Sequence, residues 1–86
     1  MRILIKSMRI LIFWYNFLMI IANRIKELRK ECGMTQSELA KLVGCSQSMV
    51  VRGEKGECEP TASAIVSLSE AFDCSCDYLL GKREDY

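Results

Sequence analysis

Apolar residues recur at helical spacing between Thr35 and Gly56, and the pattern predicts two short helices joined by a tight turn at Gly44. Thr35 and Glu38 have the spacing of a capping box, which fixes the start of the first helix. Ser46 is the predicted N-cap of the second helix. The residues expected to face inward are Leu39, Ala40, Val43, Cys45 and Val50.

Further helices are predicted on both sides of this pair. Asn23 is the expected N-cap of a helix that runs to about Cys32 and is ended by Gly33. Thr61 is positioned to cap a later helix, and Ser75 a last short one. The inward positions expected in these three helices are Ile25, Leu28, Cys32, Ala62, Ile65, Leu68, Phe72, Tyr78, Leu79 and Leu80.

Residues 1–22 are strongly apolar and do not follow this pattern. The run from Ile10 to Ala22 is too short, at about 1.5 Å per residue, to cross a bilayer core of roughly 30 Å as a helix. Three interpretations remain: translation begins at Met19, an apolar arm packs on the domain or on a partner chain, or the segment tethers the chain to a membrane. The first is favoured, because exposed apolar surface marks an interface or an aggregation liability. If the segment is ordered, its composition permits a strand or a helix running into the next one.

The sequence therefore divides into an apolar extension (1–22), one small domain (23–81) and a charged tail (82–86) that is expected to fray. The net charge is +1, and from Met19 onward nine Lys and Arg stand against eleven Asp and Glu. This chain lacks the basic excess of many nucleic-acid-binding proteins. Any affinity for nucleic acid must therefore come from local placement of charge.

Five cysteines and no histidine limit the chemistry available to the chain. There is no C-x-x-C pair, so neither a zinc site nor any other metal or cofactor is expected. Cys45 and Cys74 are predicted to pack as small apolar residues; redox sensing through Cys74 and Cys76 is the alternative. No general base, phosphate-binding loop or pair of carboxylates is apparent, so the chain is not expected to be an enzyme and has no candidate catalytic residue.

The stretch from Thr35 to Gly56 resembles the helix-turn-helix of the Cro and phage-repressor (XRE) family. The shared positions, at the spacing of that family, are Gln36, Ala40, Gly44, Val50, Glu54, Lys55 and Gly56. The resemblance covers roughly Asn23 to Gly81, which makes it far more specific than a short motif. It implies an all-α fold: a compact five-helix, lambda-repressor-like DNA-binding domain, here with an extra apolar N-terminal segment.

The resemblance implies a sequence-specific transcriptional regulator, a repressor of bacterial or phage type, that inserts the second helix of the pair in the major groove. Gln47 can address adenine, Arg52 guanine or phosphate, and Val51 a thymine methyl. Gln36 is expected to contact phosphate and to brace Gln47. The full set of expected DNA-binding residues is Gln36, Gln47, Ser48, Val51, Arg52 and Lys55.

The resemblance also implies partners and an internal contact. Arg29 is expected to form a structural ion pair with Glu54. The expected partners are a double-stranded DNA operator and a second copy of the chain in a homodimer, with no membrane partner and a cytoplasmic location. Two alternatives remain open: an antitoxin-like protein-interaction and autoregulatory module, and a membrane-tethered regulator.

Gly53 departs from the family pattern, in which a bulky aliphatic or aromatic residue is usual. Glycine at this position costs about 1 kcal/mol of helix propensity relative to alanine and leaves a gap in the predicted core. Either the core closes around the gap or another side chain fills it. Trp14 of the apolar segment is one candidate.

Overall fold

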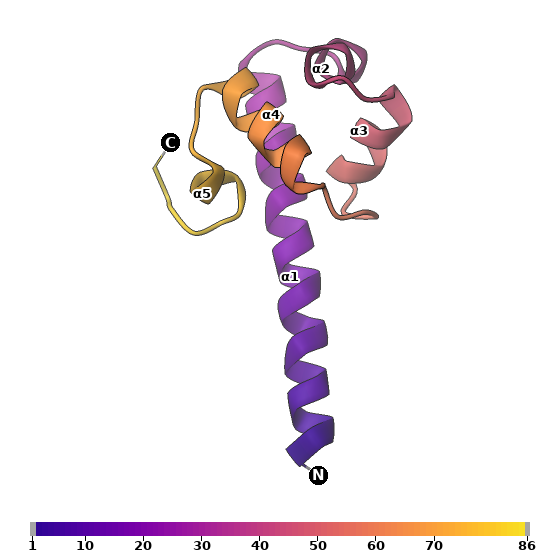
Figure 1. Ribbon diagram of the computed structural model, residues 1–86, viewed down its shortest axis with the longest axis vertical. Helices are drawn as coiled ribbons and strands as arrows, with labels where there is room; N and C mark the ends of the chain where they lie inside the picture. Colours follow the sequence, from indigo (N-terminus) through magenta and orange to yellow (C-terminus); the bar gives the residue numbers. More distant parts are fainter. Residues whose placement is uncertain (1, 86) are drawn as a thin grey trace.

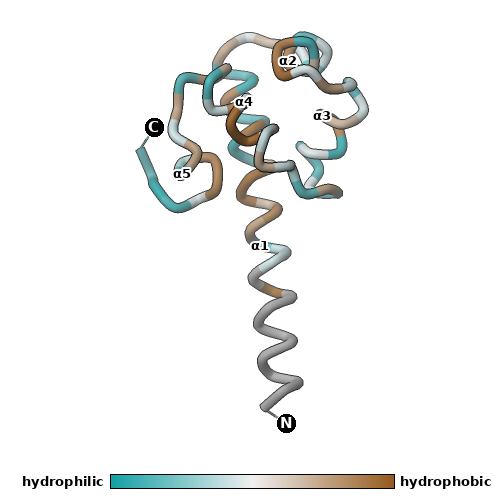
Figure 2. The backbone as a smooth tube through the Cα atoms, viewed as in Figure 1, coloured by the Kyte–Doolittle hydropathy of each residue, from teal (hydrophilic) through white to brown (hydrophobic). Residues whose placement is uncertain are grey.

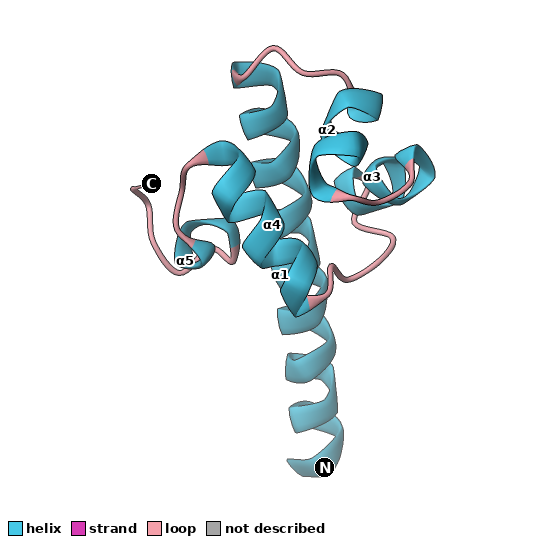
Figure 3. Cartoon of the chain, turned by 45° about the horizontal axis from the view of Figure 1, so that its top comes forward, coloured by secondary structure: helices cyan, strands magenta, loops and turns pink. Residues whose placement is uncertain are grey.

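The computed structural model describes the backbone of residues 2–85, and the side chains of residue 12 and residues 14–85. These residues form five α-helices and no strand (Figure 3). The helices are α1 (Arg2–Glu31), α2 (Gln36–Val43), α3 (Gln47–Glu54), α4 (Ala62–Phe72) and α5 (Cys76–Leu79). The C-terminal half of α1 carries the other four helices, while its N-terminal half projects away from them (Figure 1). The predicted all-α fold of five helices is confirmed.

The predicted helix caps are present. The Thr35 hydroxyl accepts a hydrogen bond from the backbone N–H of Glu38 at 3.0 Å, and the Glu38 carboxylate accepts one from the Thr35 N–H at 3.2 Å. The Gly44 backbone is left-handed, with φ 76°, as the turn between α2 and α3 requires. The side chains of Ser46, Thr61 and Ser75 cap the helices that follow them. Short-range signals therefore set where α2 to α5 begin.

The predicted start of the first helix is wrong. Asn23 is not an N-cap; it lies inside α1, which is continuous from Arg2 to Glu31. No glycine or proline precedes Gly33, so nothing in the sequence interrupts the helix. The expected boundary between residues 1–22 and 23–81 thus falls within one helix. No helix among the described residues is long and apolar enough to span a bilayer.

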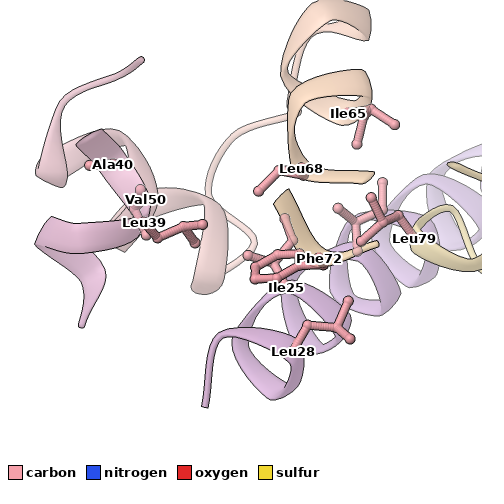
Figure 4. Packing of buried hydrophobic residues seen from close by; sticks show 10 residues of the cluster. Ile25, Leu28, Leu39, Ala40, Val50, Ile65, Leu68, Phe72 and Leu79 are labelled. Atoms are coloured by element: carbon pink, nitrogen blue, oxygen red, sulfur yellow. The ribbon is translucent and has the colours of Figure 1, made fainter. Parts of the chain in front are cut away.

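One apolar core joins all five helices (Figure 4). The brown segments of Figure 2 show that α4 and the C-terminal half of α1 are rich in the apolar residues that meet in it. Its buried members are Ile21, Ile25 and Leu28 from α1, Leu39 and Ala40 from α2, Val50 from α3, Ile65, Leu68 and Phe72 from α4, and Leu79 from α5.

Three residues expected to face inward are exposed instead. Cys45 lies in the turn between α2 and α3, and Cys32 lies just beyond the end of α1. Helical periodicity no longer applies to either residue because both lie outside the helices. Ala62 is the first residue of α4 and faces solvent.

Two glycines allow the chain to approach α1 closely where this helix enters the core. A Cβ atom on Gly56 would lie 2.8 Å from Sδ of Met19, and one on Gly81 would lie 2.7 Å from Cγ2 of Ile20. Both glycines have left-handed backbones, with φ 74° and 80°. Phe17 also packs against the core. The segment of α1 around residues 17–20 is therefore part of the packed domain, and a translation start at Met19 stays a prediction.

Candidate nucleic-acid interface

The outer surface of α3 carries the side chains that the sequence assigned to DNA. Val50 turns inward and is buried against the core residues of α2, Leu39 and Ala40. Because a helix exposes the face opposite its buried residues, Ser48 and Arg52 are left exposed to solvent. Gln47 is the first residue of α3 and is exposed at the end of the helix. Val51 is partly buried, and Lys55 is exposed just after the end of α3.

The N-terminus of α3 is held by two serine hydroxyls. Oγ of Ser46 accepts a hydrogen bond from the backbone N–H of Met49 at 3.3 Å, and it shares a second hydrogen bond of 3.1 Å with Oγ of Ser48. Ser48 is exposed, so its hydroxyl remains within reach of a ligand on this face. The hydrogen bond between Ser46 and Ser48 was not predicted, although a second serine two residues after an N-cap serine is a local signal for it.

Glu54, at the end of α3, accepts hydrogen bonds from two other helices. Its carboxylate accepts hydrogen bonds from Nε and Nη2 of Arg29, at 2.6 Å and 3.1 Å, and from Nε2 of Gln36 at 3.2 Å. Nη1 of Arg29 donates to the carbonyl oxygen of Met34 at 2.8 Å. The expected ion pair of Arg29 and Glu54 is present, and it links α1, α2 and α3.

This arrangement satisfies the carboxylate of Glu54, whose side chain is only 4% exposed. The hydrogen bond to Glu54 raises the pKa of Arg29 above its ordinary value, so the guanidinium is charged at any physiological pH. The amide nitrogen of Gln36 braces this pair, a contact that the sequence did not indicate. The expected contacts of Gln36 with Gln47 and with phosphate remain predictions.

The local charge of this surface is more positive than that of the chain. Glu54 is neutralised by Arg29, and the remaining charged side chains from Gln36 to Lys55 are all exposed. They comprise one acidic and three basic residues, namely Glu38, Lys41, Arg52 and Lys55. The outer surface of α2 and α3 therefore has a net charge of +2, although the whole chain has only +1.

Gly53 leaves a gap on the inner side of α3. A Cβ atom added to Gly53 would meet nothing within 4 Å. The gap belongs to an apolar cavity of about 170 Å³ whose lining includes Ile25, Val50 and Leu68. Trp14 does not line it: this side chain is 44% exposed and contacts the ring of Phe17, 5.9 Å away. The suggestion that Trp14 fills the gap is wrong.

The five cysteines are free, and among the described residues no group of three or more His, Cys, Asp and Glu side chains could hold a metal ion. Cys74 and Cys76 are partly buried and pack against the core. Burial raises the pKa of the Cys74 thiol, and nearby Cys76, Asp73 and Cys32 raise it further. Cys74 thus packs as a small apolar side chain, as expected, and its thiol is hard to ionise.

Comparison with known proteins finds a family, a phage repressor and several transcriptional regulators. A family model described as helix-turn-helix matches residues 25–79. The chain is 38% identical over 61 residues to repressor protein C2 of Salmonella phage P22 and 37% identical over 65 residues to the transcriptional regulator DicA of Escherichia coli. These matches cover 71% and 76% of this chain, but only 28% and 48% of the relatives. The chain therefore spans at most about half the length of these two regulators.

Solved structures agree with this fold. The P22 c2 repressor, crystallised with a synthetic operator, superposes with a TM-score of 0.70 and is 36% identical, covering 73% of this chain and 96% of that chain. The restriction-modification controller protein C.AhdI of Aeromonas hydrophila superposes with a TM-score of 0.71 and is 32% identical, covering 76% and 98%. The resemblance to phage repressors is confirmed, and with its family model matching residues 25–79 the chain belongs to the helix-turn-helix family.

Proposed function

We propose that this chain is a sequence-specific DNA-binding transcriptional regulator of the repressor type that inserts α3 in the major groove. The observation that carries the proposal is the exposure of Gln47, Ser48 and Arg52 on a helix that is held in place by its buried residues. Val50 anchors the middle of α3 in the core, and the bonds from Arg29 to Glu54 anchor its end. A rigid element presenting polar groups on one face is what base readout requires.

Four side chains of α3 have distinct chemical uses in DNA recognition. The amide of Gln47 can bond N6 and N7 of adenine, and the guanidinium of Arg52 can bond O6 and N7 of guanine or a phosphate. Val51 can contact a thymine methyl, and the Ser48 hydroxyl serves either a base or a phosphate. Because base contacts carry the sequence information, specificity is assigned to Gln47 first.

Phosphate contacts are assigned to the edge of this surface. Gln36 stands at the first position of α2, where a helix N-terminus favours an anion, and Lys55 follows the end of α3. The net charge of +2 on this surface supports such contacts without a basic excess in the whole chain. The partners proposed are a double-stranded operator and a second copy of the chain, and the proposed location is the cytoplasm. Such a function involves no catalytic step.

Selection of binding sites from a random pool of duplex DNA tests the proposal. We expect the full chain to enrich one sequence with two related half-sites, because a symmetric dimer reads a symmetric operator. Affinity for the selected site should fall as salt rises, since phosphate contacts release counterions. Absence of any enriched sequence would contradict the proposal.

A matched pair of variants locates the binding surface. Arg52→Gln and Arg83→Gln each remove one positive charge, but Arg83 lies in the C-terminal tail and bonds to Asp85. We expect Arg52→Gln to weaken binding of the selected site by 1–3 kcal/mol, about the cost of losing a good base contact. Arg83→Gln should leave the affinity almost unchanged. Equal effects of both variants would place the DNA elsewhere.

A further inference from the structure

The apolar stripe that α1 buries in the core continues, in the same register, along the half of α1 that projects from the domain. Ile21, Ile25 and Leu28 are 2%, 5% and 3% exposed and are spaced by four and three residues. The same alternation of three and four runs back toward the N-terminus of the helix. This is the a/d spacing by which two helices pair along a seam. The complete stripe is Leu4, Ser7, Leu11, Trp14, Leu18, Ile21, Ile25 and Leu28, in which Ser7 is the single polar residue.

A second, polar stripe keeps the same seven-residue period. Every seventh residue from the N-terminal end of α1 is polar: Arg2, Arg9, Asn16, Asn23 and Lys30. In the a/d register these occupy the f position, which points directly away from a partner helix. Asn16, Asn23 and Lys30 are exposed on the side of α1 away from the core. The polar stripe therefore marks the outer side of α1 along its length, although apolar residues such as Ile12 and Phe13 lie beside it in the projecting half.

The domain covers only half of the inner face. Figure 1 shows α3, α4 and α5 gathered around the C-terminal half of α1, with no other described helix beside its N-terminal half. Trp14 occupies the same register position as Ile21, yet it is 44% exposed where Ile21 is 2% exposed. Ile12 and Tyr15, near Trp14, are exposed as well. An apolar surface of this kind is typical of an interaction site.

We propose that the projecting half of α1 pairs in an antiparallel manner with the same segment of a second copy of this chain. Each arm then lies along the uncovered stripe of the other, and its N-terminus ends beneath the partner's domain. The two cores and the paired arms form one continuous apolar layer. This proposal does not depend on DNA binding.

The position of the domain selects the antiparallel arrangement. The domain lies on the same side of α1 as the apolar stripe, since Ile21, Ile25 and Leu28 all pack into it. In a parallel pair, the second helix would continue into the space that the domain occupies. Parallel pairing would also bring the two copies of Arg2 side by side, whereas antiparallel pairing places them at opposite ends of the paired segment.

The same geometry disfavours a lipid surface as the partner. A flat bilayer laid against the stripe would meet the domain, which stands on that side of the helix. A helix entering the bilayer end-on would carry the charges of Arg2, Lys6 and Arg9 into the hydrocarbon, which is costly. A second helix, about 10 Å wide, fits beside the arm without either conflict.

A groove at the base of the domain can receive the end of the partner's arm. It is mainly apolar, and its lining includes Ile21 of the stripe and Phe17, which lies beside the stripe. Glu59 lies on its lining and offers a negative charge to the partner's Arg2. The other apolar residues of the lining include Pro60, Ile65, Val66 and Leu80.

Sedimentation equilibrium of the full chain, compared with two lysine variants, tests the pairing. Leu11→Lys changes an inner position of the stripe, and Ile12→Lys makes the same change in charge at the next, outward position. We expect the unmodified chain and Ile12→Lys to be dimers. Leu11→Lys should raise the dimer dissociation constant about a hundredfold or more, as for a central interface residue. Both variants should keep the melting temperature of the monomeric domain, because both positions lie in the half of α1 that projects away from the other helices (Figure 1).

Two further measurements identify the partner and the orientation. Trp14 is the single tryptophan of the chain, so its emission should move to shorter wavelength as protein concentration rises, without lipid. Small-angle X-ray scattering should give a maximum dimension well above the 48 Å of one chain. A monomer at all concentrations, equal behaviour of the two variants, or a Trp14 shift that requires anionic phospholipid vesicles would each overturn the proposal. A dimer no longer than one chain would overturn the antiparallel arrangement.

Discussion

Arg29 of α1 holds Glu54, the last residue of α3, through two hydrogen bonds from one guanidinium, at 2.6 Å and 3.1 Å. The two residues are separated by 25 positions in sequence. Their side chains are 12% and 4% exposed, so solvent screens the pair weakly. The end of the proposed recognition helix is therefore held by a nearly buried ion pair, in addition to the anchor that Val50 provides in its middle.

We expect Glu54→Ala to lower the free energy of unfolding by about 3 kcal/mol, because it leaves the Arg29 guanidinium partly buried without its anion. The double variant Arg29→Met with Glu54→Ala should be more stable than Glu54→Ala, since it removes both charges and the methionine keeps most of the apolar volume of the arginine side chain. Urea unfolding of the unmodified chain, the two single variants Glu54→Ala and Arg29→Met, and the double variant completes a double-mutant cycle. The cycle measures the coupling energy between Arg29 and Glu54.

The exposed pair of Arg83 and Asp85 is the matched control. Asp85→Asn should change stability by less than about 0.5 kcal/mol, because a surface pair contributes little. A coupling energy near zero between Arg29 and Glu54 would show that the observed pair does not stabilise the domain.

Local signals explain how much of this fold could be predicted. The capping box of Thr35 and Glu38, the glycine turn at Gly44 and the N-cap of Ser46 each involve residues within four positions of one another. Such contacts are encoded by short-range chemistry, so α2 and α3 were placed correctly. The ion pair of Arg29 and Glu54 was expected only from the resemblance, because no local pattern links residues so far apart.

Packing between distant segments could not be predicted. The close approach of Gly56 to Met19 joins parts of the chain that share no periodicity, and it shows only in the folded protein. The bond from Gln36 to Glu54 is of the same kind. Asn23 was mistaken for a helix start because it has the side chain of a cap, whereas its place in a seven-residue polar stripe is visible only once α1 is seen as one helix.

The assignment of base readout to Gln47 leads to a specific prediction. Gln47→Ala should lose about 1–3 kcal/mol at one base position of the selected operator and leave non-specific affinity nearly unchanged. The free energy of unfolding should also stay the same, because Gln47 is exposed. Site selection with the unmodified and variant proteins measures this directly.

Gln36→Ala is the comparison for Gln47→Ala. It removes the same type of side chain but breaks the bond to Glu54, so it should lower stability and weaken all sites alike. If both variants selected the same sequence as the unmodified chain, Gln47 would not read a base.

Cys74 should make stability depend on alkaline pH. Its pKa is raised in the folded state, mainly by burial, so the unfolded chain ionises this thiol first. The folded state is therefore penalised as pH rises past the ordinary thiol range, and the free energy of unfolding should fall there. Cys74→Ala should flatten this decline, while Cys45→Ala, at an exposed position, should not. Alkylation at neutral pH should be slower at Cys74 than at Cys45; equal rates would contradict the assignment.

The cavity beside Gly53 should accept a larger side chain. Gly53→Ile adds helix propensity and apolar contact where a Cβ atom meets nothing within 4 Å, and we expect it to stabilise the domain by about 1 kcal/mol. For a domain of this size that corresponds to a rise in melting temperature of roughly 4–8 °C. DNA affinity should be retained, because Gly53 lines the inner side of α3 rather than its exposed face.

Gly56→Ala is the matched control for Gly53→Ile, and it should do the opposite. Its backbone is left-handed and its added Cβ atom would lie 2.8 Å from Sδ of Met19, so both strain and crowding should lower the melting temperature. If Gly53→Ile lowered the melting temperature in the full chain but raised it in a chain beginning at Met19, residues of the arm would occupy the cavity. A lower melting temperature in both chains would mean that the core closes tightly around Gly53, and the gap would not be a packing defect.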